Sequence, residues 1–203
     1  HYHIGVHLSR GALSDDPHKP PRGGGDEEGP STFARWFNAL TDDDEMVSTL
    51  LATTEMLRCG ITCFMEAGTA LSPDAVAAGA ETTGIRALLA DPYLWDVVGI
   101  EHSAGEIKRA PPDTERCLRV LGKELQRNKD PNSLVQGHIA LYGIGSTSDE
   151  LQRAAKQMAD EHGVVVAQHI AFLPGDAKAE DQRLGRHAVC HLRELGVLDH
   201  NTT

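Results

Sequence analysis

Three histidines in this sequence could together hold a metal ion. His1 and His3 stand two residues apart at the start of the chain, and His169 ends the apolar run VVVAQH. In a β-strand, residues i and i+2 point to the same face, about 6.5–7 Å apart along the chain. His1 and His3 would therefore project together, and two imidazoles placed in this way can converge on one cation. Taken alone, an HxH pair is more often an incidental surface feature, and a single histidine at a strand end more often bonds a neighbouring loop.

The elements that must position these histidines alternate between strand-like and helix-like patterns. Short apolar runs rich in β-branched residues predict strands, and apolar residues at helical spacing between capping residues and glycines predict helices. The expected strands are the end of a first strand at HYH and then residues 61–65, 85–90, 134–142 and 164–169. The expected helices run from a cap at Thr41 to a stop at Gly60, and over residues 72–83, 114–128, 148–162 and about 180–195.

Alternation of strands and helices implies an α/β fold in which helices pack outside a parallel sheet. Periodicity alone does not separate a closed barrel from an open sheet. No GxGxxG or GxxxxGK turn follows any of the expected strands, so an open nucleotide-binding sheet loses its main support. We therefore favour a barrel. His3 and His169 would then end strands one and five, at the face where barrel enzymes have their active sites.

The composition limits the classes of partner. The chain carries 30 acidic and 19 basic residues, a formal net charge of −11. It therefore lacks the basic footprint that nucleic acids or anionic membranes require, and no apolar run approaches the roughly 18 residues of a membrane span. The four cysteines form no CxxC pair, which favours a reduced cytoplasmic setting. Cys59 and Cys63 are expected in the core, since both are set among apolar residues.

The length indicates an incomplete domain. A complete (β/α)8 barrel usually needs about 250 residues, whereas this chain has 203 and begins on a histidine. We expect residues 1–203 to be the N-terminal portion of a barrel, with the first strand truncated and strands six to eight absent. Open strand edges favour aggregation, so we expect the chain alone to be insoluble or inactive. Residues 11–30, rich in Pro, Gly and charge, are expected to form a mobile loop.

Four stretches together resemble the amidohydrolase superfamily, most closely the branch of aminohydrolases and chlorohydrolases that act on nitrogen heterocycles. HYHIGVHLSRG resembles the family's HxH strand end, and LLATTEMLRCGITCFMEAG, the most specific stretch, resembles its first helix and second strand. STSDELQRAAKQMADEHGVVVAQH is similar to the fourth helix and the histidine of strand five, and HLRELGVLDHNTT to the segment that introduces strand six. The resemblance covers nearly the whole chain.

This resemblance implies a (β/α)8 barrel of the metal-dependent hydrolase type with one divalent metal, zinc first, with iron or manganese as alternatives. It implies that His1, His3 and His169 are metal ligands and that a strand-six histidine and a strand-eight aspartate would lie beyond Thr203. It further implies hydrolysis of C–N or C–Cl bonds of a small cyclic, nitrogen-heterocyclic substrate by a metal-activated water. We expect a small-molecule substrate and a homo-oligomer for the full-length protein.

One position departs from the family pattern. Many deaminases of this branch have a proton-shuttling glutamate three residues after the strand-five histidine, where this chain has Phe172. Phe172 could stack on a flat substrate or pack in the core, and no catalytic residue is assigned. Tyr142 and His138, at or near the end of strand four, are substrate-binding candidates, although His138 could equally face the barrel interior. Glu66 is a candidate for supporting the ligands. Phe172 also motivates an alternative: a catalytically impaired barrel that serves as a scaffold or binds a ligand.

Overall fold

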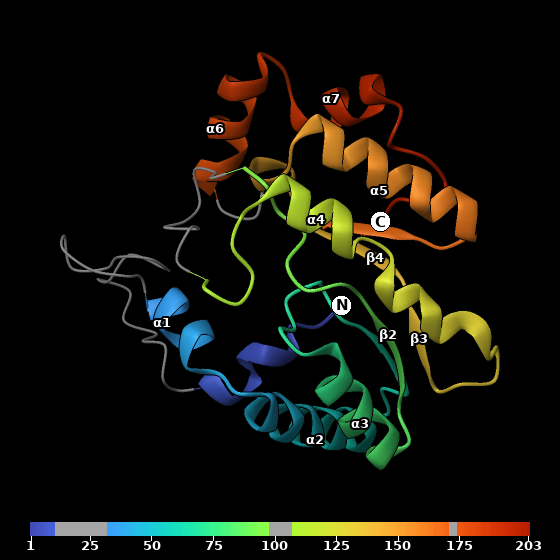
Figure 1. Cartoon of the computed structure of the whole chain (residues 1–203). Helices are drawn as coiled ribbons and strands as arrows, with labels where there is room; N and C mark the ends of the chain where they lie inside the picture. The colour runs from blue at the N-terminus through green and yellow to red at the C-terminus, as the bar shows by residue number, and fades with distance from the viewer. Residues whose placement is uncertain (11–31, 98–106, 171–173) are drawn as a thin grey trace.

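The computed structural model describes residues 1–10, 32–97, 107–170 and 174–203 (Figure 1). The expected loop over residues 11–30 and the candidate Phe172 lie outside the described residues. The strands are β1 (Cys63–Met65), β2 (Arg86–Leu89), β3 (Val135–Gly137), β4 (Ile139–Gly143) and β5 (Val166–His169). The α-helices are α1 (Thr32–Ala39), α2 (Asp42–Arg58), α3 (Pro73–Thr83), α4 (Thr114–Val120), α5 (Asp149–His162), α6 (Pro174–Leu184) and α7 (Ala188–Leu195), and the 3-10 helices are η1 (Ile4–Ser9), η3 (Lys123–Lys129) and η4 (Ile144–Ser146).

All the strand pairs are parallel. β1, β2 and β3 form one sheet in that order, and β4 and β5 form a second. Single parallel bridges extend the order at both sides, from Tyr2 to Glu66 beside β1 and from Val166 to Thr202 beside β5. The expected α/β class and parallel pairing are therefore confirmed, and the described strands do not close into a barrel.

The expected strand over residues 134–142 is wrong in one respect, because it is divided at His138. The backbone N–H of His138 donates to the carbonyl of Leu89 in β2, at 2.9 Å. The next N–H, that of Ile139, donates to Val165 just before β5, at 3.1 Å. The chain thus changes its partner at one residue. The sequence predicts one strand over residues 134–142 because both parts carry strand-like apolar residues, on either side of Gln136-Gly137-His138.

Capping residues mark the starts of α2 and α5 and the ends of α3 and α5. Thr41 and Asp44 form a reciprocal capping box at the start of α2, and the Ser148 hydroxyl accepts from the N–H of Leu151 at the start of α5. Such side chains satisfy amide groups that the first helical turn leaves free. Gly84 and Gly163 end α3 and α5 in the left-handed conformation.

Two of the expected helices are interrupted by glycines with positive φ. The helix expected over 114–128 is divided into α4 and η3 at Gly122, whose φ is +82°, and the one expected near 180–195 into α6 and α7 at Gly185, whose φ is +66°. Residues with a side chain rarely adopt such angles, whereas glycine adopts them readily. The expectation that Cys59 and Cys63 are buried is also wrong, since both are exposed.

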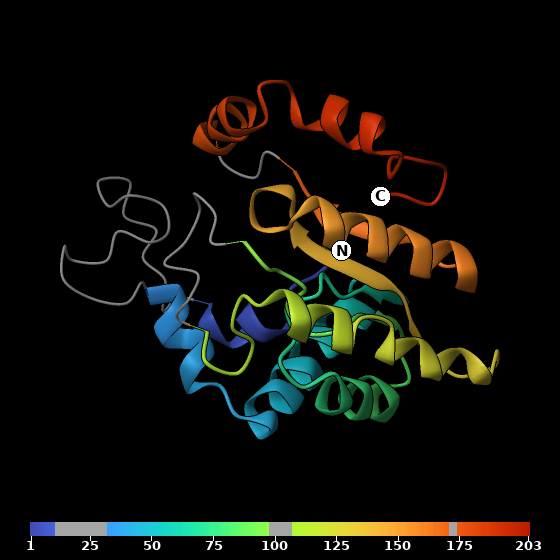
Figure 2. The same ribbon diagram turned by 45° about the horizontal axis from the view of Figure 1, so that its top comes forward.

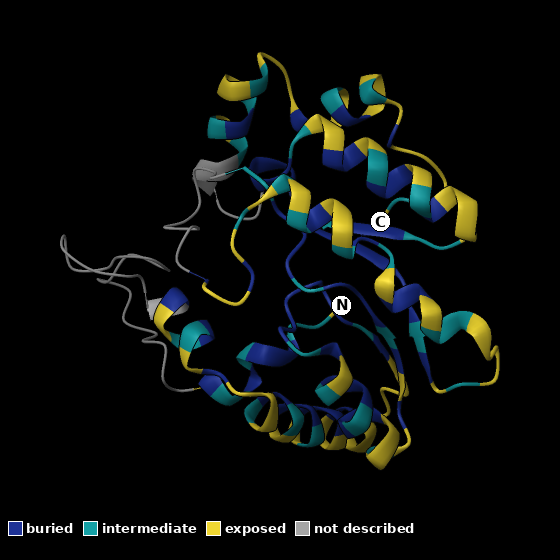
Figure 3. Cartoon of the chain, viewed as in Figure 1, coloured by how far each residue is buried: buried dark blue, intermediate teal, exposed yellow. Residues whose placement is uncertain are grey.

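Each sheet packs against its own pair of helical segments. One core cluster lies between the first sheet and α2 and α3, and includes Phe64, Val76 and Leu89. A second lies between the second sheet and α4 and α5, and includes Leu141, Leu151 and Val166. Figures 2 and 3 show the strands between these helices, with their buried residues at the centre. None of the described helices is long and apolar enough to cross a membrane.

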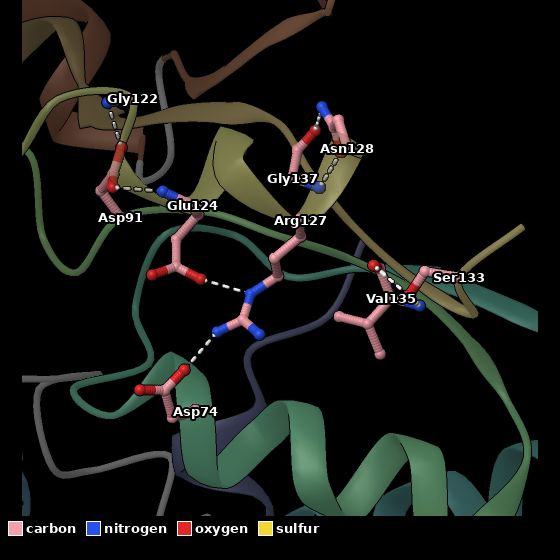
Figure 4. Close-up of polar contacts among 9 residues, drawn as sticks. All are labelled: Asp74, Asp91, Gly122, Glu124, Arg127, Asn128, Ser133, Val135 and Gly137. Atoms are coloured by element: carbon pink, nitrogen blue, oxygen red, sulfur yellow. Dashed lines mark hydrogen bonds and ion pairs between the residues drawn. The ribbon is translucent and has the colours of Figure 1, made fainter. Parts of the chain in front are cut away.

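A buried acid and an arginine connect η3 to the rest of the molecule (Figure 4). The Asp91 carboxylate accepts from the backbone N–H groups of Gly122 and Glu124, at 2.7 and 3.1 Å. Burial raises the pKa of Asp91 to about 6, although these hydrogen bonds oppose the shift. Arg127 pairs with Glu124 and with Asp74 of α3, both at 2.6 Å. Polar contacts therefore link η3 to the loop after β2 and to α3.

Candidate metal centre

The three histidines singled out by the sequence lie together in the structure. The Nε2 atoms of His1 and His3 are 3.2 Å apart, and those of His3 and His169 are 3.1 Å apart. Each residue offers a ligand nitrogen within 4.8 Å of the other two. His1 is exposed, while His3 and His169 are partly buried. Residues from the start of the chain and from the end of β5 therefore meet at one point, as the strand count predicted.

The extended start of the chain explains why His1 and His3 share this face. The N–H of Tyr2 donates to the carbonyl of Met65 at 2.8 Å, and its carbonyl accepts from Ala67 at 3.2 Å. The Tyr2 hydroxyl lies 2.6 Å from Nδ1 of the buried His7, whereas the two flanking histidines approach each other. Side chains alternate across a strand, so this pairing with β1 places both imidazoles on the same side.

β5 delivers His169 next to a glycine. Gly143 of β4 is the residue opposite His169, at an irregularity in the ladder. A β-carbon on Gly143 would lie 3.2 Å from the carbonyl oxygen of His169, closer than ordinary contact. The lack of a side chain on Gly143 therefore allows the two backbones to approach at the point where β5 presents its histidine.

A hydrogen-bond chain stands behind His3. Its Nδ1 lies 3.0 Å from the hydroxyl of Thr69, and that hydroxyl donates to Oε1 of Glu66 at 2.9 Å. A threonine hydroxyl has one proton, so the Thr69 oxygen accepts from the N–H at Nδ1 of His3. The other nitrogen, Nε2, faces His1 and His169. Glu66, expected to support the ligands, thus contacts His3 through Thr69. Thr69 itself was not singled out by the sequence.

Glu66 is a buried acid with several donors. Its carboxylate accepts from the N–H of Gly68 at 2.7 Å and from the N–H of Thr69 at 3.1 Å, besides the Thr69 hydroxyl. Burial raises the pKa of Glu66 to about 7, and the hydrogen bonds from Thr69 and Gly68 oppose that rise. Gly68 has a φ of +77°, and a β-carbon there would lie 2.9 Å from that of Ala140 in β4. Only glycine fits a turn that is both left-handed and in contact with the neighbouring strand.

The two described substrate-binding candidates have different surroundings. Tyr142 lies near the cluster, with its ring centroid 6.3 Å from that of His169. It stacks on Tyr93 at 5.4 Å and contacts Trp95 edge-on at 5.3 Å. His138 is buried, its Nε2 donates to the carbonyl of Glu66 at 2.8 Å, and its Nδ1 has no partner among the described residues. Tyr142 thus borders the histidines, whereas His138 supports the backbone of Glu66.

An open pocket of about 350 Å³ adjoins the histidines, lined by His1, Tyr2, His3, Val6, His7 and Arg10. Arg10 pairs with Glu55 at 2.9 Å, and burial lowers the pKa of His7. Because this pocket reaches His1 and His3, solvent has access to two of the three imidazoles.

The donor set fits a zinc-like ion. Catalytic zinc sites commonly use three protein ligands, often imidazole nitrogens, and keep one position open. A second hydrogen bond from the ligand's other ring nitrogen is usual at such sites, and His3 has one to Thr69. His1, His3 and His169 are therefore the described residues suited to hold the ion.

Comparison with known proteins identifies the family of the chain. The model of the amidohydrolase family matches residues 1–203. A 5-methylthioadenosine/S-adenosylhomocysteine deaminase of Aquifex aeolicus is 28% identical over 75% of this chain and 32% of its own length. An atrazine chlorohydrolase of Arthrobacter aurescens, crystallised with zinc, is similar with a TM-score of 0.66 at 21% identity, covering 83% of this chain and 39% of that one.

Another solved structure is similar over the whole chain. An amidohydrolase of Brucella melitensis has a TM-score of 0.69 at 15% identity, and the match covers 100% of this chain and 47% of that one. The chain thus spans about a third of the length of the curated relatives it matches. Because the family model extends from the first residue to the last, the chain belongs to the amidohydrolase family.

Proposed function

We propose that this chain is the front portion of a metal-dependent hydrolase that acts on C–N or C–Cl bonds of a small nitrogen-heterocyclic substrate. The observation that carries the proposal is the convergence of three Nε2 atoms from His1, His3 and His169. Family membership supports it. The names of similar proteins, a deaminase of purine nucleosides and a triazine chlorohydrolase, suggest the two bond types.

The proposed architecture is a (β/α)8 barrel of which this chain supplies strands one to five. The parallel order from residue 2 through β1 to β5, with Thr202 bridged beside β5, supports it. On this proposal the histidines lie at the carboxyl ends of strands one and five, where barrel enzymes have their active sites. Residues 1–203 are then a single portion of one domain.

A divalent metal, zinc first, bound by the three histidines would supply a Lewis acid that makes water nucleophilic at neutral pH. The chain's own residues would do the rest. Thr69 and Glu66 would support the His3 ring from its Nδ1 side. Tyr142 would form one wall for a flat ring beside His169, and Phe172 could stack on the same substrate. We further propose a cytoplasmic protein that forms a homo-oligomer and binds neither nucleic acid nor membrane.

A second candidate function is a non-catalytic barrel that binds a ligand or serves in assembly. It is favoured by Phe172, since a phenylalanine cannot transfer the proton that glutamate carries at this position in many deaminases of the family. The two proposals differ in turnover but agree on the fold.

Metal analysis combined with a substrate screen tests the proposal. The purified full-length protein should contain one zinc, iron or manganese per chain. With that metal it should hydrolyse at least one member of a panel of purine nucleosides, pyrimidines, pterins and triazines. The variant His169→Ala should lose the metal, whereas His191→Ala, which removes a histidine bonded to Asp149 at 2.7 Å, should keep it.

Each other outcome has a defined meaning. Absence of stoichiometric metal in the wild-type protein would overturn the hydrolase proposal. Stoichiometric metal with saturable ligand binding but no turnover on the whole panel would favour the non-catalytic alternative.

A further inference from the structure

Two polar residues touch the proposed metal centre only through His3. Thr69 lies on the Nδ1 side of the His3 ring, and Glu66 lies behind Thr69. Thr69 and Glu66 are each about 1% exposed. Burying a carboxylate is costly unless donors surround it, so its presence next to a ligand calls for an explanation.

One explanation is purely structural: the Glu66 carboxylate caps the loop after β1. It does accept from the N–H groups of Gly68 and Thr69, at 2.7 and 3.1 Å. Those two bonds would be complete without the hydroxyl of Thr69. That hydroxyl adds a third bond to Glu66 and, through its oxygen, a bond to His3. Loop capping therefore does not account for the side chain of Thr69.

The donor and acceptor roles in this hydrogen-bond chain are set at Thr69. When Glu66 is ionised, as at pH 8, the single hydroxyl proton of Thr69 goes to the carboxylate. Only a lone pair of the hydroxyl is then left for His3, so His3 donates from Nδ1. A neutral imidazole that is protonated at Nδ1 has its lone pair at Nε2. Nε2 of His3 is also the atom that lies 3.2 Å from His1 and 3.1 Å from His169.

We propose that Thr69 and Glu66 are positioning residues that fix the tautomer and ring orientation of His3, so that its unprotonated Nε2 is presented to a divalent metal. The inference rests on the proposed function, since it concerns a ligand of the same centre. His138 takes part indirectly, because its Nε2 donates to the backbone carbonyl of Glu66 at 2.8 Å. The loop after β1 thus contacts the Glu66 carboxylate, and His138, at the joint between β3 and β4, contacts the Glu66 backbone.

The tautomer can be read in the wild-type protein without any substitution. Nitrogen-15 NMR of the metal-free protein at pH 8 should show His3 protonated at Nδ1 and unprotonated at Nε2. A His3 ring protonated at Nε2 would overturn the proposal.

Zinc affinity, measured by competition with a chelator, provides the second test. Thr69→Val keeps the shape and the backbone N–H of Thr69 but removes the hydroxyl, and it should bind zinc about 10–100-fold more weakly, the usual cost of losing such an outer partner. Thr69→Ser restores the hydroxyl and should restore affinity. Thr49→Val is the matched control, because the buried Thr49 hydroxyl donates to the carbonyl of Glu45 in its own helix, at 2.7 Å.

The outcomes separate this inference from the function on which it rests. Zinc binding by Thr69→Val at wild-type affinity would overturn the positioning role and leave the metal centre standing. Equal losses in Thr69→Val and Thr49→Val would also overturn it, as a general effect of removing a buried hydroxyl. A wild-type protein that binds no zinc would instead overturn the metal centre itself.

Discussion

His3 and His169 reach the same point from two halves of the molecule, and the two halves hold them by different means. Behind His3 stands the Thr69 hydroxyl, and behind that hydroxyl a buried carboxylate that accepts from it and from two backbone N–H groups. Beside His169 stand the Tyr142 ring at 6.3 Å and the close backbone of Gly143. The first half contacts its histidine through a directional hydrogen-bond chain, and in the second an aromatic ring and a close backbone border the histidine.

This difference bears on how each half tolerates change. A hydrogen-bond chain fixes a proton as well as an orientation, and it fails when one buried partner is removed. Aromatic and backbone packing fixes the position of a ring over a softer range, since neighbouring side chains can adjust by a few tenths of an ångström. Substitutions in the first half should therefore alter binding more sharply than comparable ones in the second.

The largest effect is expected from removing a ligand on either side. His3→Ala and His169→Ala should both reduce zinc from one equivalent per chain to a small fraction, because each removes one of three converging nitrogens. Elemental analysis after dialysis measures this. If one of the two variants kept a full equivalent, that histidine would not be a ligand and the two halves would not share the centre.

The second prediction compares how much stability is lost when the buried acid Glu66 or the aromatic ring of Tyr142 is removed. Glu66→Ala leaves the N–H groups of Gly68 and Thr69 without an acceptor, and we expect a loss of about 3–5 kcal/mol in the free energy of unfolding. Tyr142→Leu loses its contacts with Tyr93 and Trp95, and we expect about 2 kcal/mol. Urea denaturation of the metal-free proteins at pH 8 compares them. A larger loss for Tyr142→Leu would reverse the assignment of polar support to the first half.

The histidine cluster could be predicted from the sequence because it depends on periodic patterns of strand residues. Alternation along HYH and the apolar run before His169 place the imidazoles on strand ends, and strand counting brings the ends together. Capping residues such as Thr41 and Ser148 likewise identify the starts of α2 and α5. These features are local, and local patterns are what a sequence displays.

Features that depend on a neighbouring strand could not be predicted in this way. The division at His138 arises because the first part of the expected strand over 134–142 pairs with β2 and the second part with β5. Thr69 bonds His3 across 66 positions, and nothing in the run EAGT marks its hydroxyl for that role. The interruptions at Gly122 and Gly185 are visible as glycines, but a positive φ follows only from the packing around them.

A third experiment asks whether buried acids in the first half make stability depend on pH. Asp91 has a pKa raised from 3.8 to about 6, chiefly by burial. The folded state then holds the proton more tightly than the unfolded state, so this contribution is fully present below about pH 4 and is lost as pH rises to about 6. Over that window we expect the free energy of unfolding to fall by about 2–3 kcal/mol more in the wild-type protein than in Asp91→Asn.

Urea titrations at pH 4, 5, 6 and 7 would measure this difference. Glu81→Gln, which alters an exposed acidic side chain in α3, serves as the reference for general charge effects. Parallel pH profiles for the wild type and Asp91→Asn would show that the acid beside Gly122 carries no such penalty.

The smallest effect is expected at the glycine opposite His169. Gly143→Ala would place a β-carbon 3.2 Å from the His169 carbonyl oxygen, and a shift of a few tenths of an ångström should weaken zinc binding by about threefold to tenfold. Gly163→Ala is unsuitable as a control because its φ is +64°. Ala155→Gly, a small change at a buried position of α5, serves instead. A loss as large as that of Thr69→Val would show that shape matters as much as hydrogen bonding.

The contact between His3 and His169 joins residues 166 positions apart in the sequence. An ion held by both would therefore act as a covalent cross-link does, closing a loop that contains both sheets and both of their core clusters. Closing so long a loop restricts the unfolded chain far more than the folded one, by about 5 kcal/mol in the chain-entropy description used for disulfides. The cluster that would activate water would at the same time keep the two halves of the chain from separating.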